Sequence, residues 1–308
     1  MANITAEMVK NLREKTGAGM MDCKAALTET KGDFDAAVDW LRKKGLSKAA
    51  KKASRIAAEG LIGVRAEGKR GAVVEVNSET DFVARNETFQ DFVRAANGNV
   101  FVVGTSVEKL LAAPHVSGAL TTGEVLTNLI AKIGENMQVR RAAELSVSSG
   151  VIASYVHNAV TPDLGKIGVL VALQSSAPAD KLMPLGKQLA MHIAAAAPLA
   201  LSVNELDPKM VARERAIFAD QARASGKPDN VIEKMVEGRL RKFYEESVLN
   251  SQIFVIDGET PIAKVLEKAA KDFGAPVQIA GFVRFAVGEG IEKEETDFAA
   301  EVKAAAGH

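Results

Sequence analysis

The sequence predicts an α+β protein assembled from several small modules. Three observations support this prediction: helical spacing of apolar residues between glycine breaks near the start, two stretches that repeat one another, and two strongly helical segments inserted into the second repeat. The chain has 308 residues. That length is sufficient for two or more domains, each with its own core.

Composition narrows the class of protein. The 39 basic and 39 acidic residues cancel, and 47% hydrophobic with 25% charged residues is typical of a globular chain, which argues against disordered, collagen-like and membrane proteins. A neutral chain has no global attraction to nucleic acid or anionic lipid, so we expect neither as a partner unless a local patch provides the charge.

Cysteine and histidine usage indicates a reducing compartment and no bound metal. Cys23 is the one cysteine, and the four histidines show no metal-ligand spacing with it. The N-terminal residues alternate acids and bases and lack the apolar run of a signal peptide. We therefore expect a cytoplasmic protein without a cofactor.

Residues 1–55 are predicted to form three short helices. Thr5 is placed to cap the first and Asp22 to cap the second, while the third begins after Asp33 and ends at Gly45. This order resembles the ubiquitin-associated (UBA) three-helix module, a class that binds partners. Met20 and Met21 lie on the predicted loop, either as core residues or as a flexible docking surface.

Residues 42–55 form a basic segment, with seven basic residues and no acidic one. It could bind RNA, but it has no interleaved aromatic residue on which a base could stack. A solvated helix and linker between two modules is the favoured interpretation.

Two stretches in the middle of the chain are predicted to share one architecture. Each begins with a β-hairpin and continues with helices and a third strand, and the second helix–strand pair follows the first in register at an offset of 140 residues. We expect a duplicated core with small antiparallel sheets. Its two subdomains are residues 56–147 and residues 148–200 with 250–286.

The second copy is interrupted by residues 201–249. Asp207 and Pro208 begin one amphipathic helix, and a second helix returns after Gly226 and Pro228. The pattern predicts an antiparallel helical hairpin, or coiled coil, that projects from the core. It serves either as a stabilising insertion or as an arm for dimerisation or docking. Residues 287–308 are left as a C-terminal helical module.

Catalytic motifs are weak. Residues 63–70 almost match a phosphate-binding loop, but Arg70 replaces the hydroxyl residue and the glycines fall in a predicted hairpin rather than before a helix. The acidic cluster at Glu289 and residues 292–295 is typical of a solvated helix start. We therefore expect a binding protein rather than an enzyme.

The segment Ser78-Glu79-Thr80-Asp81-Phe82-Val83 directly follows a predicted strand. Thr80 is placed to cap a helix, with Asp81 in the first turn. Phe82 lies seven residues before Phe89, so both could belong to the core. Alternatively, Asp81 and Phe82 form an exposed wedge of charge and apolar surface. Thr296-Asp297-Phe298-Ala299 repeats the pattern near the C-terminus.

Several long motifs carry a family resemblance. The chain resembles bacterial elongation factor Ts from end to end, through TGAGMMDCK at 16–24, ETDFVAR at 79–85, KIGEN at 132–136, MH at 191–192, EKMVEGR at 233–239 and GEGIEK at 288–293. Ser78 and Ile253 depart from residues common in that family.

The resemblance implies a guanine-nucleotide exchange factor that binds elongation factor Tu. By that resemblance, Asp81 and Phe82 would enter the partner's GTPase domain and disturb its magnesium site, and Met20 and Met21 would lie near its phosphate loop. The remaining implied contacts are with the third domain, through Ile133 and His157, and with the GTPase domain, through Asp297.

Overall fold

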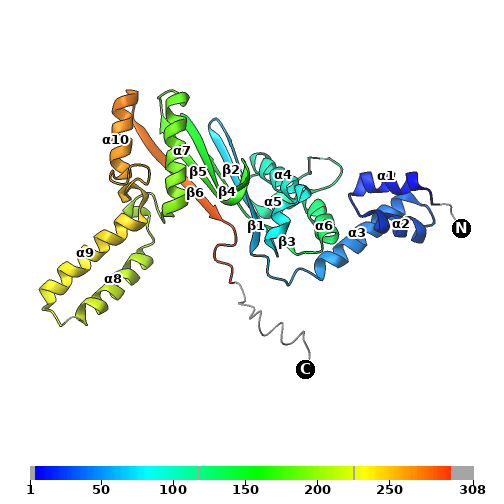
Figure 1. The fold of residues 1–308 in the computed structure, drawn as a ribbon, viewed down its shortest axis with the longest axis horizontal. Helices are drawn as coiled ribbons and strands as arrows, with labels where there is room; N and C mark the ends of the chain where they lie inside the picture. Colours follow the sequence, from blue (N-terminus) through cyan, green and yellow to red (C-terminus); the bar gives the residue numbers. More distant parts are fainter. Residues whose placement is uncertain (1–3, 117, 225, 293–308) are drawn as a thin grey trace.

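The computed structural model describes residues 4–116, 118–224 and 226–292. Three helices lie at one end of the molecule, a curled sheet flanked by helices occupies the middle, and a pair of helices projects from the other side (Figure 1). The mixed α+β class predicted from the sequence is confirmed.

The N-terminal helices are α1 (Ala6–Thr16), α2 (Met20–Glu29) and α3 (Phe34–Ala50). As predicted, the Thr5 hydroxyl accepts the Met8 N–H at the start of α1. A small core that includes Leu12, Leu27 and Leu41 lies between the three helices. This unit contacts the rest of the protein through α6 (Thr122–Ile133), where Arg42 pairs with Glu124.

Two predicted helix signals in this unit are wrong. Helix α2 begins at Met20 after an unassisted Gly19 cap, because the Asp22 carboxylate instead pairs with Lys44 and Lys48 of α3, each at 3.0 Å. Helix α3 continues past Gly45 to Ala50. Gly45 therefore lies inside α3 at its contact with α6, where a Cβ would meet the Asn128 side chain at an ordinary contact distance of 3.6 Å, and it does not end the helix.

The strands form antiparallel pairs, and both predicted hairpins are present. β1 pairs with β2 around the tight turn after Glu67, and β4 pairs with β5 around residues 162–163. The strands are β1 (Glu59–Glu67), β2 (Arg70–Ser78), β3 (Met137–Ser146), β4 (Gly150–Thr161), β5 (Leu164–Ser175) and β6 (Val277–Ala286).

The prediction of separate small sheets is wrong, because the six strands form one sheet. Its order is β3-β2-β1-β5-β4, with β6 also on β5. The two halves join where Ile62 and Gly63 of β1 pair with Gly165 and Leu164 of β5. The sheet then curls so that Ile62, with other residues of both halves, encloses a shared core.

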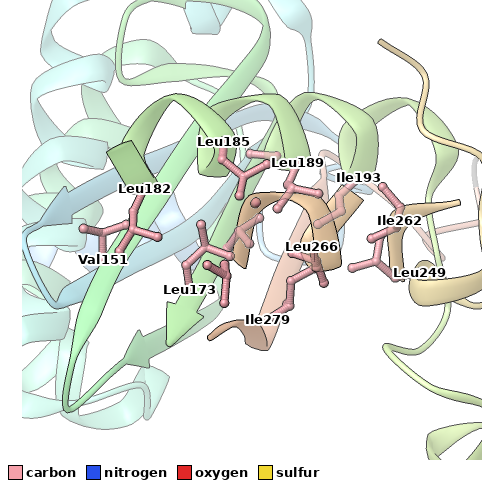
Figure 2. Packing of buried hydrophobic residues seen from close by; sticks show 14 of the residues in the cluster. Val151, Leu173, Leu182, Leu185, Leu189, Ile193, Leu249, Ile262, Leu266 and Ile279 are labelled. Atoms are coloured by element: carbon pink, nitrogen blue, oxygen red, sulfur yellow. The ribbon is translucent and has the colours of Figure 1, made fainter. Parts of the chain in front are cut away.

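Helices cover the outer faces of the two halves. On β1–β3 lie α4 (Glu87–Val103), α5 (Val107–Ala112) and α6, around a core that contains Phe89 and Phe92. On β4–β6 lie α7 (Ala179–Ala196) and α10 (Ile262–Phe273). Figure 2 shows Leu182, Leu185 and Leu189 of α7 packed toward the strands in this second core.

Helices α8 (Pro208–Arg223) and α9 (Asp229–Ser247) form the predicted hairpin, and Asp207 caps α8 as expected. A seam of their own apolar residues, including Ala222, Val236 and Leu240, joins them. Short 3-10 turns, η2 (Val203–Glu205) and η3 (Leu249–Ser251), lie where the hairpin meets the body. The hairpin extends away from the sheet (Figure 1).

After β6 the chain forms a turn over residues 287–290 that contacts β2 and β3. Gly288 donates its N–H to the fully buried Glu75 at 2.8 Å, and Arg140 donates to the Glu289 carbonyl at 2.6 Å. Glu289 of the predicted acidic cluster forms ion pairs with Arg141 and Arg284. Residues 293–308, which include Asp297, lie outside the described residues.

Candidate partner-binding surface

The sharpest surface feature is a short 3-10 turn, η1 (Asp81–Arg85), between β2 and α4. Its Val83 and Ala84 are buried and anchor the turn, whereas Asp81 is exposed and the Phe82 side chain is 73% exposed. Phe89 is fully buried, so the interpretation of both phenylalanines as core residues is wrong for Phe82. The turn therefore presents an acid and an aromatic ring side by side.

The predicted Thr80 cap is also wrong, and the reason reveals how the turn is supported. The Thr80 hydroxyl makes no cap to η1. It donates instead to Glu135 at 2.7 Å, while the Thr80 N–H donates to the other oxygen of the same carboxylate at 2.9 Å. The Glu79 carboxylate in turn accepts the Asn136 N–H at 2.5 Å. We call Thr80, Glu79, Glu135 and Asn136 the carboxylate clamp.

Ile133 lies beside this clamp, as the last residue of α6. Its side chain is half-buried and packs against the core of the β1–β3 half. Gly134 follows in a left-handed conformation, φ 87°, and ends the helix, so that residues 135 and 136 turn toward the Asp81–Phe82 segment. The fold thus brings Ile133 into the neighbourhood of the wedge residues.

Met20 and Met21 occupy the first turn of α2 rather than a loop. They are 59% and 76% exposed, so they are not core residues. Both line a groove of about 950 Å³ between the start of α1, α2 and Lys132 of α6. Lys132, which immediately precedes Ile133, is the one residue of α6 that lines this groove. Its basic rim comprises Lys10, Arg13, Lys24 and Lys132.

His157 belongs to the other half of the sheet, near the end of β4. It is exposed, and its Nδ1 lies 3.2 Å from the Tyr155 hydroxyl. Within the described part of the chain, no contact joins it to the residues of the wedge or the groove. The structure therefore places Met20 and Met21 at the groove, holds the segment after Ile133 against the residues before Asp81 and Phe82, and leaves His157 on the other half of the sheet.

The basic segment 42–55 is partly neutralised, because four of its seven basic residues pair with acidic side chains. Lys44 and Lys48 pair with Asp22, and burial of that carboxylate, which would raise its pKa, is outweighed by the two lysines, so the pKa of Asp22 is lowered. Arg42 pairs with Glu124 and Arg55 with Glu79. These pairs favour the predicted linker over an RNA-binding patch.

Other features bear on possible chemistry. Residues 63–70 lie in the β1–β2 hairpin, as predicted, and not before a helix. Among residues 4–116, 118–224 and 226–292, no three acidic, cysteine or histidine side chains form a group able to hold a metal ion. In the same ranges, every helix is too short or too polar to cross a membrane.

Sequence reasoning missed two polar networks. The clamp residues Glu79, Glu135 and Asn136 were assigned to two motifs but to no contact with one another, because their pairing depends on β2 and β3 lying together. No role was assigned to Glu75, yet it is fully buried against Arg140 and Arg141. A signal existed for the second: one acid within an otherwise apolar strand and an adjacent arginine pair.

A family model and several full-length relatives carry the same name. The family model described as elongation factor TS matches residues 79–289. Proteins named elongation factor Ts from Rhodospirillum centenum and Rhodospirillum rubrum are 62% identical over 307 residues and 63% identical over 305 residues. The alignments cover 100% of both chains in the first case and 99% of both in the second.

A protein of the same name from Paramagnetospirillum magneticum is 60% identical over 307 residues, with 100% of this chain and 98% of the relative covered. The similarity therefore includes the exposed Asp81–Phe82 turn, the groove and the helical hairpin. On these matches and their full-length coverage, the chain belongs to the elongation factor Ts family.

Proposed function

We propose that this protein is a guanine-nucleotide exchange factor that binds elongation factor Tu and promotes GDP release during translation elongation. Membership of the elongation factor Ts family supports the partner and the process. The observation that carries the proposal is the exposure of Phe82, at 73%, on a turn whose next two residues are buried. A large apolar side chain held rigidly in water suits insertion into another protein.

The proposed mechanism uses Asp81 and Phe82 as a wedge in the GTPase domain of the partner. The ring would enter an apolar pocket and the carboxylate would repel the phosphates, which together disturb the magnesium and phosphate site. Exchange then follows from linkage. If the protein binds the nucleotide-free partner more tightly than the GDP-bound partner, it weakens GDP binding in the same ratio. Each difference of about 1.4 kcal/mol changes that coupling tenfold.

Further contacts would distribute binding over the chain. Met20 and Met21 would press near the phosphate loop of the GTPase domain, a role supported by their exposure above the groove. Ile133 and His157 would grip the third domain of the partner. Asp297, outside the described residues, would add a contact with the GTPase domain. Contacts from both halves of the sheet would hold the wedge at a fixed distance from the third domain.

We also propose a domain organisation. It comprises a UBA-like domain (1–55), two duplicated subdomains (56–147, and 148–200 with 250–286), a coiled-coil insertion (201–249) and a C-terminal module (287–308). The duplication is supported by matching bounds, because α6 and α10 begin at residues 122 and 262, and β3 and β6 at 137 and 277. The hairpin would act either as a stabilising insertion or as an arm for docking or homodimerisation.

The proposed activity requires protein binding alone. We infer that the protein acts in the cytoplasm as an exchange factor rather than an enzyme, and that nucleic acid is not a direct partner. The acidic partners of Arg42, Lys44, Lys48 and Arg55 support the last inference, since they reduce the positive field that RNA would need.

The test is release of a fluorescent GDP from purified elongation factor Tu in excess unlabelled GDP. A substoichiometric amount of this protein should accelerate release with turnover, because each molecule leaves once nucleotide rebinds. No acceleration, with both proteins folded, would refute the exchange function. A salt titration of RNA binding would then examine residues 42–55.

A further inference from the structure

The wedge turn is connected to two other parts of the chain through the carboxylate clamp. Glu135, in the turn after α6, accepts both the N–H and the hydroxyl of Thr80, at 2.9 and 2.7 Å. Glu79 reaches back in the opposite direction and accepts the N–H of Asn136 at 2.5 Å. Two segments 55 or more residues apart thus hold each other by reciprocal carboxylate bonds.

The linker from the N-terminal helices ends in the same place. Arg55 pairs with Glu79 at 3.3 Å through its side chain, and its carbonyl accepts the Asn136 side-chain amide at 2.7 Å. The Ser78 hydroxyl donates to the Thr80 carbonyl at 2.9 Å. The backbone directly before Asp81 is therefore fixed on both its N–H and its carbonyl side.

This arrangement is more than a generic surface ion pair. Bonds to a carboxylate are shorter and stronger than neutral ones, and bonds to main-chain groups fix the path of the backbone. The side chain that benefits is Phe82, which has few contacts of its own because it is 73% exposed. An exposed ring can be presented in one direction only if the backbone beneath it is held.

We propose that Glu135 and Glu79 are positioning residues for nucleotide exchange, which orient the Asp81–Phe82 wedge and link it to the N-terminal helices through Arg55. Neither carboxylate needs to touch the partner for this role. The inference rests on the proposed exchange function. It goes further by assigning the orientation of the wedge to a polar clamp whose residues lie in the motifs at 79–85 and 132–136.

The first experiment replaces Glu135 by Gln, which keeps the shape but turns an amide NH₂ toward one of the Thr80 donors. The matched control is Glu144→Gln, at the other end of β3, where a carboxylate accepts two bonds from Arg70. We expect Glu135→Gln to slow the maximal catalysed GDP release roughly tenfold, since small misplacement of a reacting group is costly. Binding of the nucleotide-free partner should weaken by less than about threefold, or roughly 0.7 kcal/mol.

A double-mutant cycle separates positioning from general stability. In a background with both Asp81 and Phe82 replaced by Ala, no wedge side chain is left to orient, so Glu135→Gln should slow release by less than about twofold. Thr80→Val removes only the hydroxyl bond and should give a smaller loss that also disappears in this background. Equal losses with and without the two wedge side chains, or a loss in Glu144→Gln as large as in Glu135→Gln, would overturn the proposal.

The second experiment uses the protein alone and so does not depend on the exchange function. Hydrogen exchange of the Thr80 amide, which is bonded to Glu135, should become roughly tenfold faster in Glu135→Gln and stay unchanged in Glu144→Gln. If wild-type protein fails to accelerate GDP release, the exchange function falls while this measurement still tests the clamp. Glu135→Ala removes both acceptors of Thr80, so unchanged Thr80 exchange in that variant would refute the positioning role by itself.

Discussion

Glu75 and Gly288 are 213 positions apart, yet the main-chain N–H of Gly288 donates to the Glu75 carboxylate at 2.8 Å. The carboxylate is fully buried and also accepts from Arg140, Arg141 and Asn77. Burial by itself would raise the pKa of Glu75, but the Gly288 N–H, Asn77 and Arg141 together hold it below its ordinary value. One acid thus connects β2, β3 and the segment after β6.

Replacement of Glu75 by Gln should destabilise the protein by about 3 kcal/mol, because two arginines lose their buried counter-charge. Glu144→Gln, whose Arg70 pair lies nearer the surface, should cost less than about 1 kcal/mol. Urea unfolding monitored by circular dichroism would compare the two midpoints. Similar urea midpoints for the two variants would show that the buried Glu75 network contributes no more stability than the more exposed Arg70–Glu144 pair.

Glu75 should also contribute an acid-side pH dependence. Since its folded pKa is lowered, its stabilisation is complete above the unfolded value near 4.5 and is lost as pH falls through the folded pKa. Urea midpoints of wild type and Glu75→Gln between pH 6 and pH 3 should therefore converge at the acid end. A constant gap over that interval would be the contrary result.

Gly288 and Gly290 form a matched pair for a test of close packing. Both have positive φ, 72° and 77°, but a Cβ at Gly288 would lie 2.1 Å from the Ala58 carbonyl, whereas at Gly290 the nearest atom, on Arg140, is 3.9 Å away. Gly290→Ala should cost about 1 kcal/mol from backbone strain alone. Gly288→Ala should cost clearly more, as measured by thermal unfolding. Equal losses for the two variants would mean that the segment after β6 can shift away from Ala58.

Truncation of Phe89 should destabilise the protein far more than truncation of Phe82. Phe89→Ala removes a fully buried ring and should destabilise the protein by about 3–5 kcal/mol. Phe82→Ala should change stability by less than about 0.5 kcal/mol, because the ring is exposed. Denaturant unfolding of both variants measures this contrast. A large loss for Phe82→Ala would show that the ring supports the fold rather than a partner contact.

The wedge role itself is tested by joint replacement of Asp81 and Phe82 with Ala. We expect catalysed GDP release to slow far more than complex formation weakens, since the wedge acts on the loaded partner while other surfaces provide affinity. Stopped-flow release and calorimetric titration give the two quantities. Parallel losses in both would count against a wedge.

His192 predicts a second pH effect. Its ring is fully buried beneath α7. Its Nε2 lies 2.9 Å from the side-chain oxygen Oε1 of Gln252, and its Nδ1 accepts the Val255 N–H. Burial lowers its pKa, against an opposing bond from Gln252, so protonation favours the unfolded chain. The folded protein therefore has no penalty from His192 above the unfolded-state pKa near 6.5, and it loses stability as pH falls below that pKa.

Thermal midpoints between pH 7.5 and pH 5 would reveal the effect of His192. Wild type should lose stability across that range, and His192→Gln, which cannot be protonated, should lose less although it starts from a lower midpoint. His115 also has a pKa lowered by burial, so the difference between the two proteins is the relevant quantity. Parallel curves would mean that His192 accepts a proton in the folded state without penalty.

Local pattern was a sound guide to the elements themselves. The caps at Thr5 and Asp207 and both hairpin turns were predicted because each depends on a few neighbouring residues. Gly45 and Asp22 were misassigned for the opposite reason. Gly45 lies inside α3 where that helix meets α6, and Asp22 pairs with lysines of α3, and both contacts exist only once the helices pack together.

The candidate site shows the same division. The exposed wedge was one of two interpretations at Asp81 and Phe82, and the sequence could not choose, because helical spacing to Phe89 is compatible with burial of both rings. The 3-10 turn moved Phe82 off that spacing. The single sheet was missed because the short pairing of β1 with β5 leaves no signal within either repeat.

The hairpin of α8 and α9 leaves and re-enters the body at one point. Ala200 and Val248 form a β-bridge, and the Leu199 N–H donates to the Ser247 carbonyl at 2.8 Å. Residues 201–247 therefore form a loop whose two ends are held together at the body. The entropic cost of closing such a loop rises only logarithmically with its length. The hairpin could therefore be lengthened, shortened or exchanged during evolution with little effect on the stability of the body.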